Sequence, residues 1–167
     1  MIDYYKTLIE SHRRSGILID TNILLLLFLG AVDPSHIPTF KRTRQFVVED
    51  YTTLTLILAS FEKVITTPHI LTEVSNLSAQ LGDPLKTTYF RFFSEAIGYL
   101  QEEQIPSASV AADYVFIRFG LTDAALYTLS MDGYLVLTDD FRLSQYLQSR
   151  EIAVINFNHI RTLGWEM

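Results

Sequence analysis

The stretch that decides the fold comprises residues 16–29 and reads GILIDTNILLLLFL. Its first four residues form a short apolar segment, which is typical of a β-strand buried on both faces. Asp20, Thr21 and Asn22 interrupt the apolar sequence, which resumes at Ile23. Asp is a favoured residue at a helix N-cap, so the stretch predicts a buried strand, a polar turn and then an apolar helix.

The same alternation continues along the chain. Further apolar strands are predicted at 64–67, 134–137 and 152–157. Helices are predicted at 1–14, 22–29, 41–50, 51–61, 68–81, 85–103, 107–119, 122–131 (with Thr122 as N-cap) and 141–150, and 30–40 is expected to be a loop. Short strands alternating with helices indicate an α/β fold of three layers, α/β/α, around a central, mostly parallel sheet. In such sheets the functional crevice lies beyond the carboxyl ends of the strands.

Composition excludes several classes of protein. The chain has 167 residues, which suits one domain, and it has no cysteine, which excludes disulfides, thiolate catalysis and cysteine-based zinc sites. No apolar run approaches the roughly 20 residues of a membrane span, and residues 1–14 lack the apolar region of a signal peptide. We therefore expect a cytoplasmic protein without a membrane partner. The apolar fraction is 49%, and aromatic residues crowd 85–99, which together predict a homodimer.

Carboxylates follow the predicted strands in a regular way. One comes directly after the strand at 16–19, two follow the strand at 134–137, and two more stand near the starts of helices: in that order, Asp20, Asp139, Asp140, Glu73 and Asp123. We expect these side chains to meet at one edge of the sheet. Gathered negative charges repel and are costly to desolvate, and no matching set of Lys or Arg lies beside them. Oxygen ligands of this kind suit Mg²⁺ or Mn²⁺, which indicates hydrolysis of phosphodiester bonds.

Each carboxylate also has a purely structural interpretation. Asp20 can cap the helix that follows it, Asp123 can favour a helix start, and Asp139 and Asp140 can serve a turn and a cap. Glu73 can be a solvated helix residue. Separate structural roles that all place carboxylates at one sheet edge are a less economical explanation than a single site.

The order of motifs resembles the PIN domain, which includes the VapC-type toxin nucleases. The matching stretches are I-D-T-N-I-L from Ile19, T-x-x-x-x-x-E from Thr67, T-D-A-A from Thr122 and L-T-D-D-F from Leu137, within residues 16–157. The resemblance implies a single domain over 1–167, with 1–15 as an N-terminal extension, and a metal-dependent endoribonuclease that is often a homodimer. It implies an acidic, metal-binding quartet with supporting polar groups: Asp20, Glu73, Asp123 and Asp140, supported by Asn22, Thr138 and Asp139. A toxin would also have an antitoxin partner.

The net charge of −6 is opposite to that of a typical nucleic-acid binder. Five of the 13 basic residues nevertheless fall within 13–44, and we expect them to border the site and hold RNA phosphates: Arg13, Arg14, Lys41, Arg42 and Arg44. A solvated helix face is the alternative for Lys41, Arg42 and Arg44. A catalytically silent PIN-fold scaffold that binds RNA or protein is the alternative for the whole chain. A phosphatase of the haloacid dehalogenase type is disfavoured, because it needs a second Asp where Asn22 stands.

Overall fold

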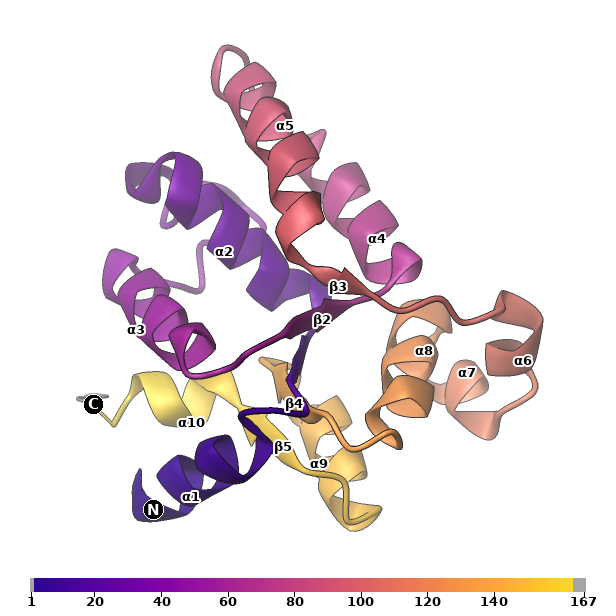
Figure 1. Ribbon diagram of the computed structural model, residues 1–167. Helices are drawn as coiled ribbons and strands as arrows, with labels where there is room; N and C mark the ends of the chain where they lie inside the picture. Colours follow the sequence, from indigo (N-terminus) through magenta and orange to yellow (C-terminus); the bar gives the residue numbers. More distant parts are fainter. Residues whose placement is uncertain (1, 164–167) are drawn as a thin grey trace.

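Five parallel strands form one sheet in the order β3-β2-β1-β4-β5 (Figure 1). The computed structural model describes residues 2–163. The strands are β1 (Ile17–Ile19), β2 (Val64–Thr66), β3 (Gln101–Glu102), β4 (Leu135–Thr138) and β5 (Val154–Asn156). The α-helices are α1 (Ile2–His12), α2 (Thr21–Val32), α3 (Val48–Ala59), α4 (Pro68–Ser78), α5 (Leu85–Ala96), α6 (Ser107–Ala111), α7 (Tyr114–Phe119), α8 (Leu121–Ser130), α9 (Phe141–Ser149) and α10 (Phe157–Arg161). Two 3₁₀ turns are η1 (Pro34–His36) and η2 (Ile97–Tyr99).

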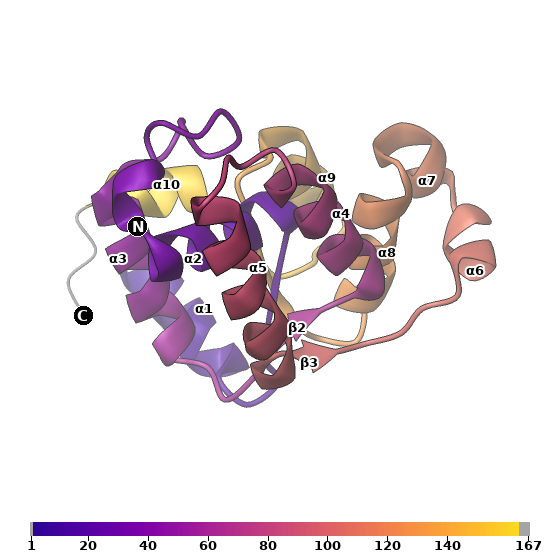
Figure 2. The same ribbon diagram turned by 90° about the horizontal axis from the view of Figure 1, so that it is seen from above.

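The strand order reverses direction at β1. Leu18 pairs with Ile65 of β2 on one side and with Val136 of β4 on the other, so the chain builds the sheet outward from β1 both ways. Since parallel crossovers are right-handed, connections that run in opposite directions place their helices on opposite faces. Figures 1 and 2 show this arrangement, with α2 and α3 on one face and α8 and α9 on the other. The three-layer α/β/α fold is confirmed, and its crevice is expected at the carboxyl ends of β1 and β4.

Helix α2 is the centre of the apolar core on its face of the sheet. It is apolar almost all round, and it packs against α3, α4 and α5. The Phe28 ring lies 5.1 Å from the ring of Phe93 and 5.6 Å from that of Phe92, measured between centroids. Tyr89 is also buried here. The aromatic residues of α5 are thus explained by packing within the chain, and the homodimer stays a prediction.

One predicted helix is wrong over most of its length, and another ends earlier than predicted. Residues 41–46 form turns rather than a helix, and the Thr43 hydroxyl donates a hydrogen bond to the Ile37 carbonyl, which satisfies a backbone group of this turn region. The predicted helix 85–103 ends at Ala96, and η2 and the edge strand β3 follow it. The two residues of β3, Gln101 and Glu102, are polar and therefore carry no apolar strand signal.

Other predicted boundaries need smaller corrections. The helix predicted at 107–119 is divided into α6 and α7, because the Asp113 carboxylate accepts the Val115 N–H and starts a new helix. The N-cap of α8 is Gly120 and not Thr122. Gly120 has a φ of 84°, a conformation that residues with a side chain rarely adopt. The short helix α10 was not predicted.

No helix within residues 2–163 combines the length and the apolar character needed to cross a membrane.

The close approach of α2 and α3 gives a stability prediction. A Cβ atom at Gly30 of α2 would overlap the ring of Tyr51 in α3. We expect Gly30→Ala to lower the free energy of unfolding by about 1–3 kcal/mol, because the overlap outweighs the gain of about 1 kcal/mol in helix propensity. Urea denaturation followed by circular dichroism measures the change. Gly98→Ala is the matched control, because a Cβ there meets no atom within 4 Å and should leave stability unchanged or raised.

Candidate active site

Asp20 joins the ends of the two central strands. It follows β1 and is buried, with 6% of its surface exposed. One carboxylate oxygen accepts the Ile23 N–H at 2.9 Å and so caps α2, as the structural interpretation had it. The other oxygen accepts the Thr138 hydroxyl and the backbone N–H of Asp139, both from the end of β4. These three hydrogen bonds fix the orientation of the carboxylate at the crevice.

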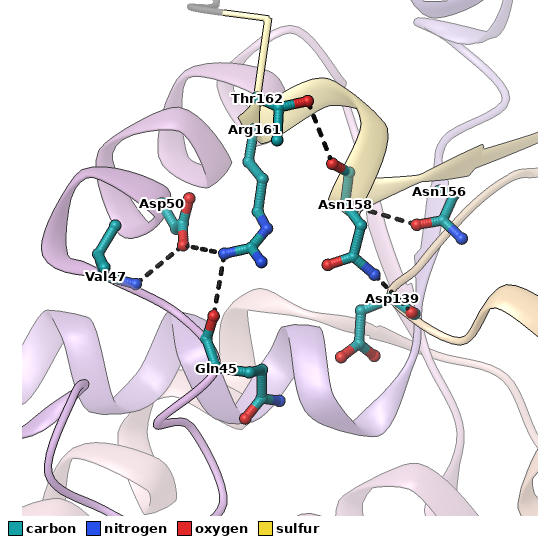
Figure 3. A network of polar contacts seen from close by, with 8 residues as sticks. All are labelled: Gln45, Val47, Asp50, Asp139, Asn156, Asn158, Arg161 and Thr162. Carbon is teal, nitrogen blue, oxygen red and sulfur yellow. Dashed lines mark hydrogen bonds and ion pairs between the residues drawn. The ribbon is translucent and has the colours of Figure 1, made fainter.

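Asp139 is the carboxylate most closely connected to Asp20. Its side chain accepts a hydrogen bond of 3.1 Å from the Asn22 amide, and the Gln45 amide lies beside it (Figure 3). Burial raises the pKa of Asp139, while the hydrogen bonds from Asn22 and Gln45 oppose that rise. The pKa of Asp20 is raised well above its usual value by burial and by the negative charge of Asp139. Asp139, which the sequence analysis placed among the supporting groups, is therefore at the centre of the cluster.

Asp140 is turned toward α9. Its carboxylate accepts the Leu143 N–H at 2.9 Å and is the N-cap of that helix. Its backbone N–H donates to the Thr138 hydroxyl oxygen at 3.0 Å. Its charge is still close enough to Asp123 to raise the pKa of that residue. Asp140 thus combines the structural role with a place at the rim of the cluster.

Asp123 and Glu73 approach from two helices that pack together, α8 and α4. Asp123 lies in the first turn of α8, and burial raises its pKa to about 7, with further contributions from the charges of Asp140, Glu73 and Asp139. Glu73 is exposed on α4 and lines a hollow of about 340 Å³. The other residues that line it are Pro68, His69, Thr72, Asn76, Leu121 and Thr122. An open space therefore adjoins the acidic cluster.

Two side chains of helix α10 bond to the backbone around the cluster (Figure 3). The Asn158 amide donates to the backbone carbonyl of Asp139 at 2.8 Å. Arg161 donates to the Gln45 carbonyl at 3.0 Å and forms an ion pair of 2.7 Å with the buried Asp50. Arg161 thereby fixes the loop that carries the Gln45 amide toward Asp139.

No basic side chain of the described residues, 2–163, forms an ion pair with the cluster. Within residues 2–163 the ion pairs are those of Arg161 with Asp50 and of His36 with Asp33, and neither includes a carboxylate of the site. In the same part of the chain, no three His, Cys, Asp or Glu side chains are gathered tightly enough to form a ready-made metal centre. The cluster is therefore a set of mutually repelling carboxylates whose side chains do not converge on a single point.

The basic residues predicted to border the site do not all do so. Arg13 and Arg14 precede β1, and Arg13 pairs through its carbonyl with the N–H of Glu62 before β2. They lie at the amino edge of the sheet, opposite Asp20, so the prediction is wrong for these two. Lys41 is exposed in the turn region, and Arg42 donates to the Gln80 side chain at 3.1 Å. Arg44 is exposed and precedes Gln45 in the chain.

The sequence analysis missed Gln45, Asn156 and Asn158. Asn156 ends β5, caps α10 and donates to the Ser144 hydroxyl at 2.9 Å. The I-N-F-N sequence has the same strand-then-polar pattern as the Asp20 motif and could have revealed this edge. Gln45 lies in a turn region without periodicity, and no local signal indicates its role.

No protein-family model matches the chain, and none of the curated proteins is detectably similar to it in sequence.

The raised pKa of Asp123 predicts a pH-dependent stability. Because its pKa is about 7 in the folded protein and 3.8 as the ordinary value, the folded state binds more protons between these limits. Stability without metal should therefore be highest at the acidic end and fall as the pH rises toward 7. Asp123→Asn should remove this loss and be more stable than the parent at pH 8 by about 1–3 kcal/mol.

Denaturation in EDTA between pH 4 and 8 (roughly the two pKa values and just beyond) measures the effect. Asp132→Asn, at an exposed turn, is the control that removes one carboxylate elsewhere. A parallel pH profile for the parent and Asp123→Asn would contradict the prediction.

Proposed function

We propose that this protein is a Mg²⁺- or Mn²⁺-dependent endoribonuclease that hydrolyses RNA phosphodiester bonds at the Asp20 cluster. The observation that carries the proposal is a group of buried or half-buried carboxylates at the carboxyl ends of β1 and β4, without a cationic partner in residues 2–163. The resemblance of the sequence motifs to the PIN domain points in the same direction.

The donor chemistry suits such an ion. All the candidate ligands are oxygen atoms, and burial together with their mutual repulsion raises the pKa values of Asp20 and Asp123. Divalent magnesium keeps several of its waters, so a few protein carboxylates that are not tightly gathered can hold it. A bound Mg²⁺ or Mn²⁺ supplies Lewis acidity and activates water for attack on phosphorus.

Each side chain has a role that follows from its surroundings. Asp20 is held by three hydrogen bonds and keeps a free lone pair, which makes it the best candidate for a direct ligand. Asp139, oriented by Asn22, and Asp123 are the next candidates. Glu73 and Asp140 lie at the rim and would act through water. Thr138 is a positioning residue, because its hydroxyl donates a hydrogen bond to the Asp20 carboxylate and accepts one from the N–H of Asp140.

A catalytically silent scaffold is the second candidate. It is favoured by the absence of a ready-made metal cluster in the described part of the chain and by the capping roles of Asp20 and Asp140. Calorimetric titration with Mn²⁺ separates the two functions. A nuclease should bind Mn²⁺ and lose binding in Asp123→Asn, whereas a scaffold need not bind it. The homodimer and the antitoxin partner stay predictions.

The test of catalysis replaces Asp20 with Asn. Asn keeps the oxygen that caps α2 but removes the charge, so we expect RNA cleavage in Mn²⁺ to fall by about a hundredfold or more. The melting temperature in EDTA should hold or rise, because the removal of a buried, repelled charge outweighs the loss of an acceptor for the Thr138 hydroxyl and the Asp139 N–H. Cleavage of total RNA and thermal melting are measured for the parent, Asp20→Asn and the exposed control Asp132→Asn. Full cleavage by purified Asp20→Asn would end the catalytic role of this residue.

A further inference from the structure

Three arginines gather on two aromatic rings along α9. The guanidinium of Arg118 lies 5.1 Å from the ring centre of Phe119 and 5.2 Å from that of Tyr146. Arg142 lies 5.9 Å from Phe119, and Arg150 lies 5.3 Å from Tyr146. The rings of Phe119 and Tyr146 are themselves 5.3 Å apart. We call these three arginines on their two rings the arginine stripe.

The stripe follows from helical spacing. Arg142, Tyr146 and Arg150 are separated by four residues each, so they lie along one face of α9 and its C-cap. Helix α7 adds Arg118 and Phe119 to the same face through the contact between the rings. The stripe therefore begins two residues after Asp140, at the rim of the acidic cluster, and runs along α9 away from it.

The guanidinium groups are free to bind a ligand. All three arginines are exposed, and within residues 2–163 none of them has an ion pair or a side-chain hydrogen bond. Stacking on a ring stabilises an exposed guanidinium weakly, and it holds the plane in place while the N–H groups at its edge stay available. Three positive charges that have no ion pair in the described part of the chain, in a protein of net charge −6, favour the binding of an anionic partner.

An exposed aromatic ring also stands at the first residue of α9. Phe141 lies between Asp140 and Arg142 in the chain, and 55% of its surface is exposed. One edge of its ring faces His159 of α10, with 6.5 Å between the ring centres. Proteins that bind single-stranded nucleic acids combine basic side chains for the backbone with exposed aromatic rings on which bases stack. Helix α9 thus carries an exposed ring and two of the three arginines of the stripe next to the carboxylates, which matches that combination.

We propose that the arginine stripe binds the phosphate backbone of single-stranded RNA, with one base stacked on Phe141, and so leads the strand to the Asp20 cluster. This inference rests on the proposed nuclease function, since it names the surface that holds its substrate. The stripe replaces Arg13 and Arg14, which lie at the opposite edge of the sheet, as the phosphate-binding surface.

The experiment measures binding without cleavage. A short, fluorescently labelled single-stranded RNA is titrated in EDTA, and anisotropy gives the affinity between about 50 and 200 mM salt, a range over which phosphate contacts are strongly weakened. The triple variant Arg118→Gln, Arg142→Gln, Arg150→Gln should bind at least about tenfold more weakly at low salt. Its plot of log affinity against log salt should be shallower by about 2, since each lost phosphate contact on a single strand removes about 0.7.

Matched variants separate charge from fold. Arg13→Gln, Arg14→Gln, Lys63→Gln removes the same charge at the amino edge and should leave the salt slope unchanged. Arg118→Lys, Arg142→Lys, Arg150→Lys keeps the charges and should retain most of the slope. Phe141→Leu should weaken binding by about fivefold to a hundredfold through lost stacking, whereas Tyr99→Leu, exposed before β3 at the amino edge, should not.

Two outcomes would overturn the proposal. One is an unchanged salt slope in the folded triple Gln variant with only a lower melting temperature, which would mean that the arginines merely cover the rings. The other is an equal loss of slope in the amino-edge control, which would mean that net charge alone governs binding. Neither outcome depends on catalysis. If Asp20→Asn still cleaves RNA while the triple Gln variant loses binding, the catalytic proposal fails and the stripe stands.

Discussion

The hydrogen bond from the Thr138 hydroxyl to the Asp20 carboxylate is the contact on which the rest of the site depends. It joins the ends of β1 and β4, where the strand order reverses. Through Asp20 it fixes the start of α2, the buried helix at the centre of one face, and through the N–H of Asp140 it fixes the start of α9 on the other face. Both helix starts and both central strands therefore share one buried side-chain pair.

This arrangement has an electrostatic cost. Asp20, Asp123 and Asp139 are buried or half-buried, and each lacks a cationic partner in the part of the chain that the structure describes. Their raised pKa values mean that the folded protein disfavours the ionised form of each carboxyl group. The neighbouring arginine stripe carries positive charges that have no ion pair in the same part of the chain. A ligand that brings cations to the first surface and phosphates to the second would relieve both, and ligand binding of this kind stabilises the fold.

The sequence by itself determined the positions that lie next to a strand in the chain. The apolar segment before Asp20, the one before Asp139 and Asp140, and Thr67 before Pro68 each mark a strand end or helix start through local chemistry. Because all the strands are parallel, their carboxyl ends must meet at one edge. Four of the five strands, their parallel arrangement and the identity of the acidic residues could therefore be predicted without a structure.

Only the tertiary structure decided which of these residues touch. Asp139 and Asp140 are neighbours in the chain, but only the packing of Asn22 and Gln45 turns the first toward Asp20, while α9 takes the second as its cap. Gln45 reaches the site because Arg161 holds its loop. The arginine stripe joins α7 to α9, and the edge strand β3 exists only because β2 offers it a partner. Such contacts link residues far apart in the chain, so no local sequence pattern or periodicity indicates them.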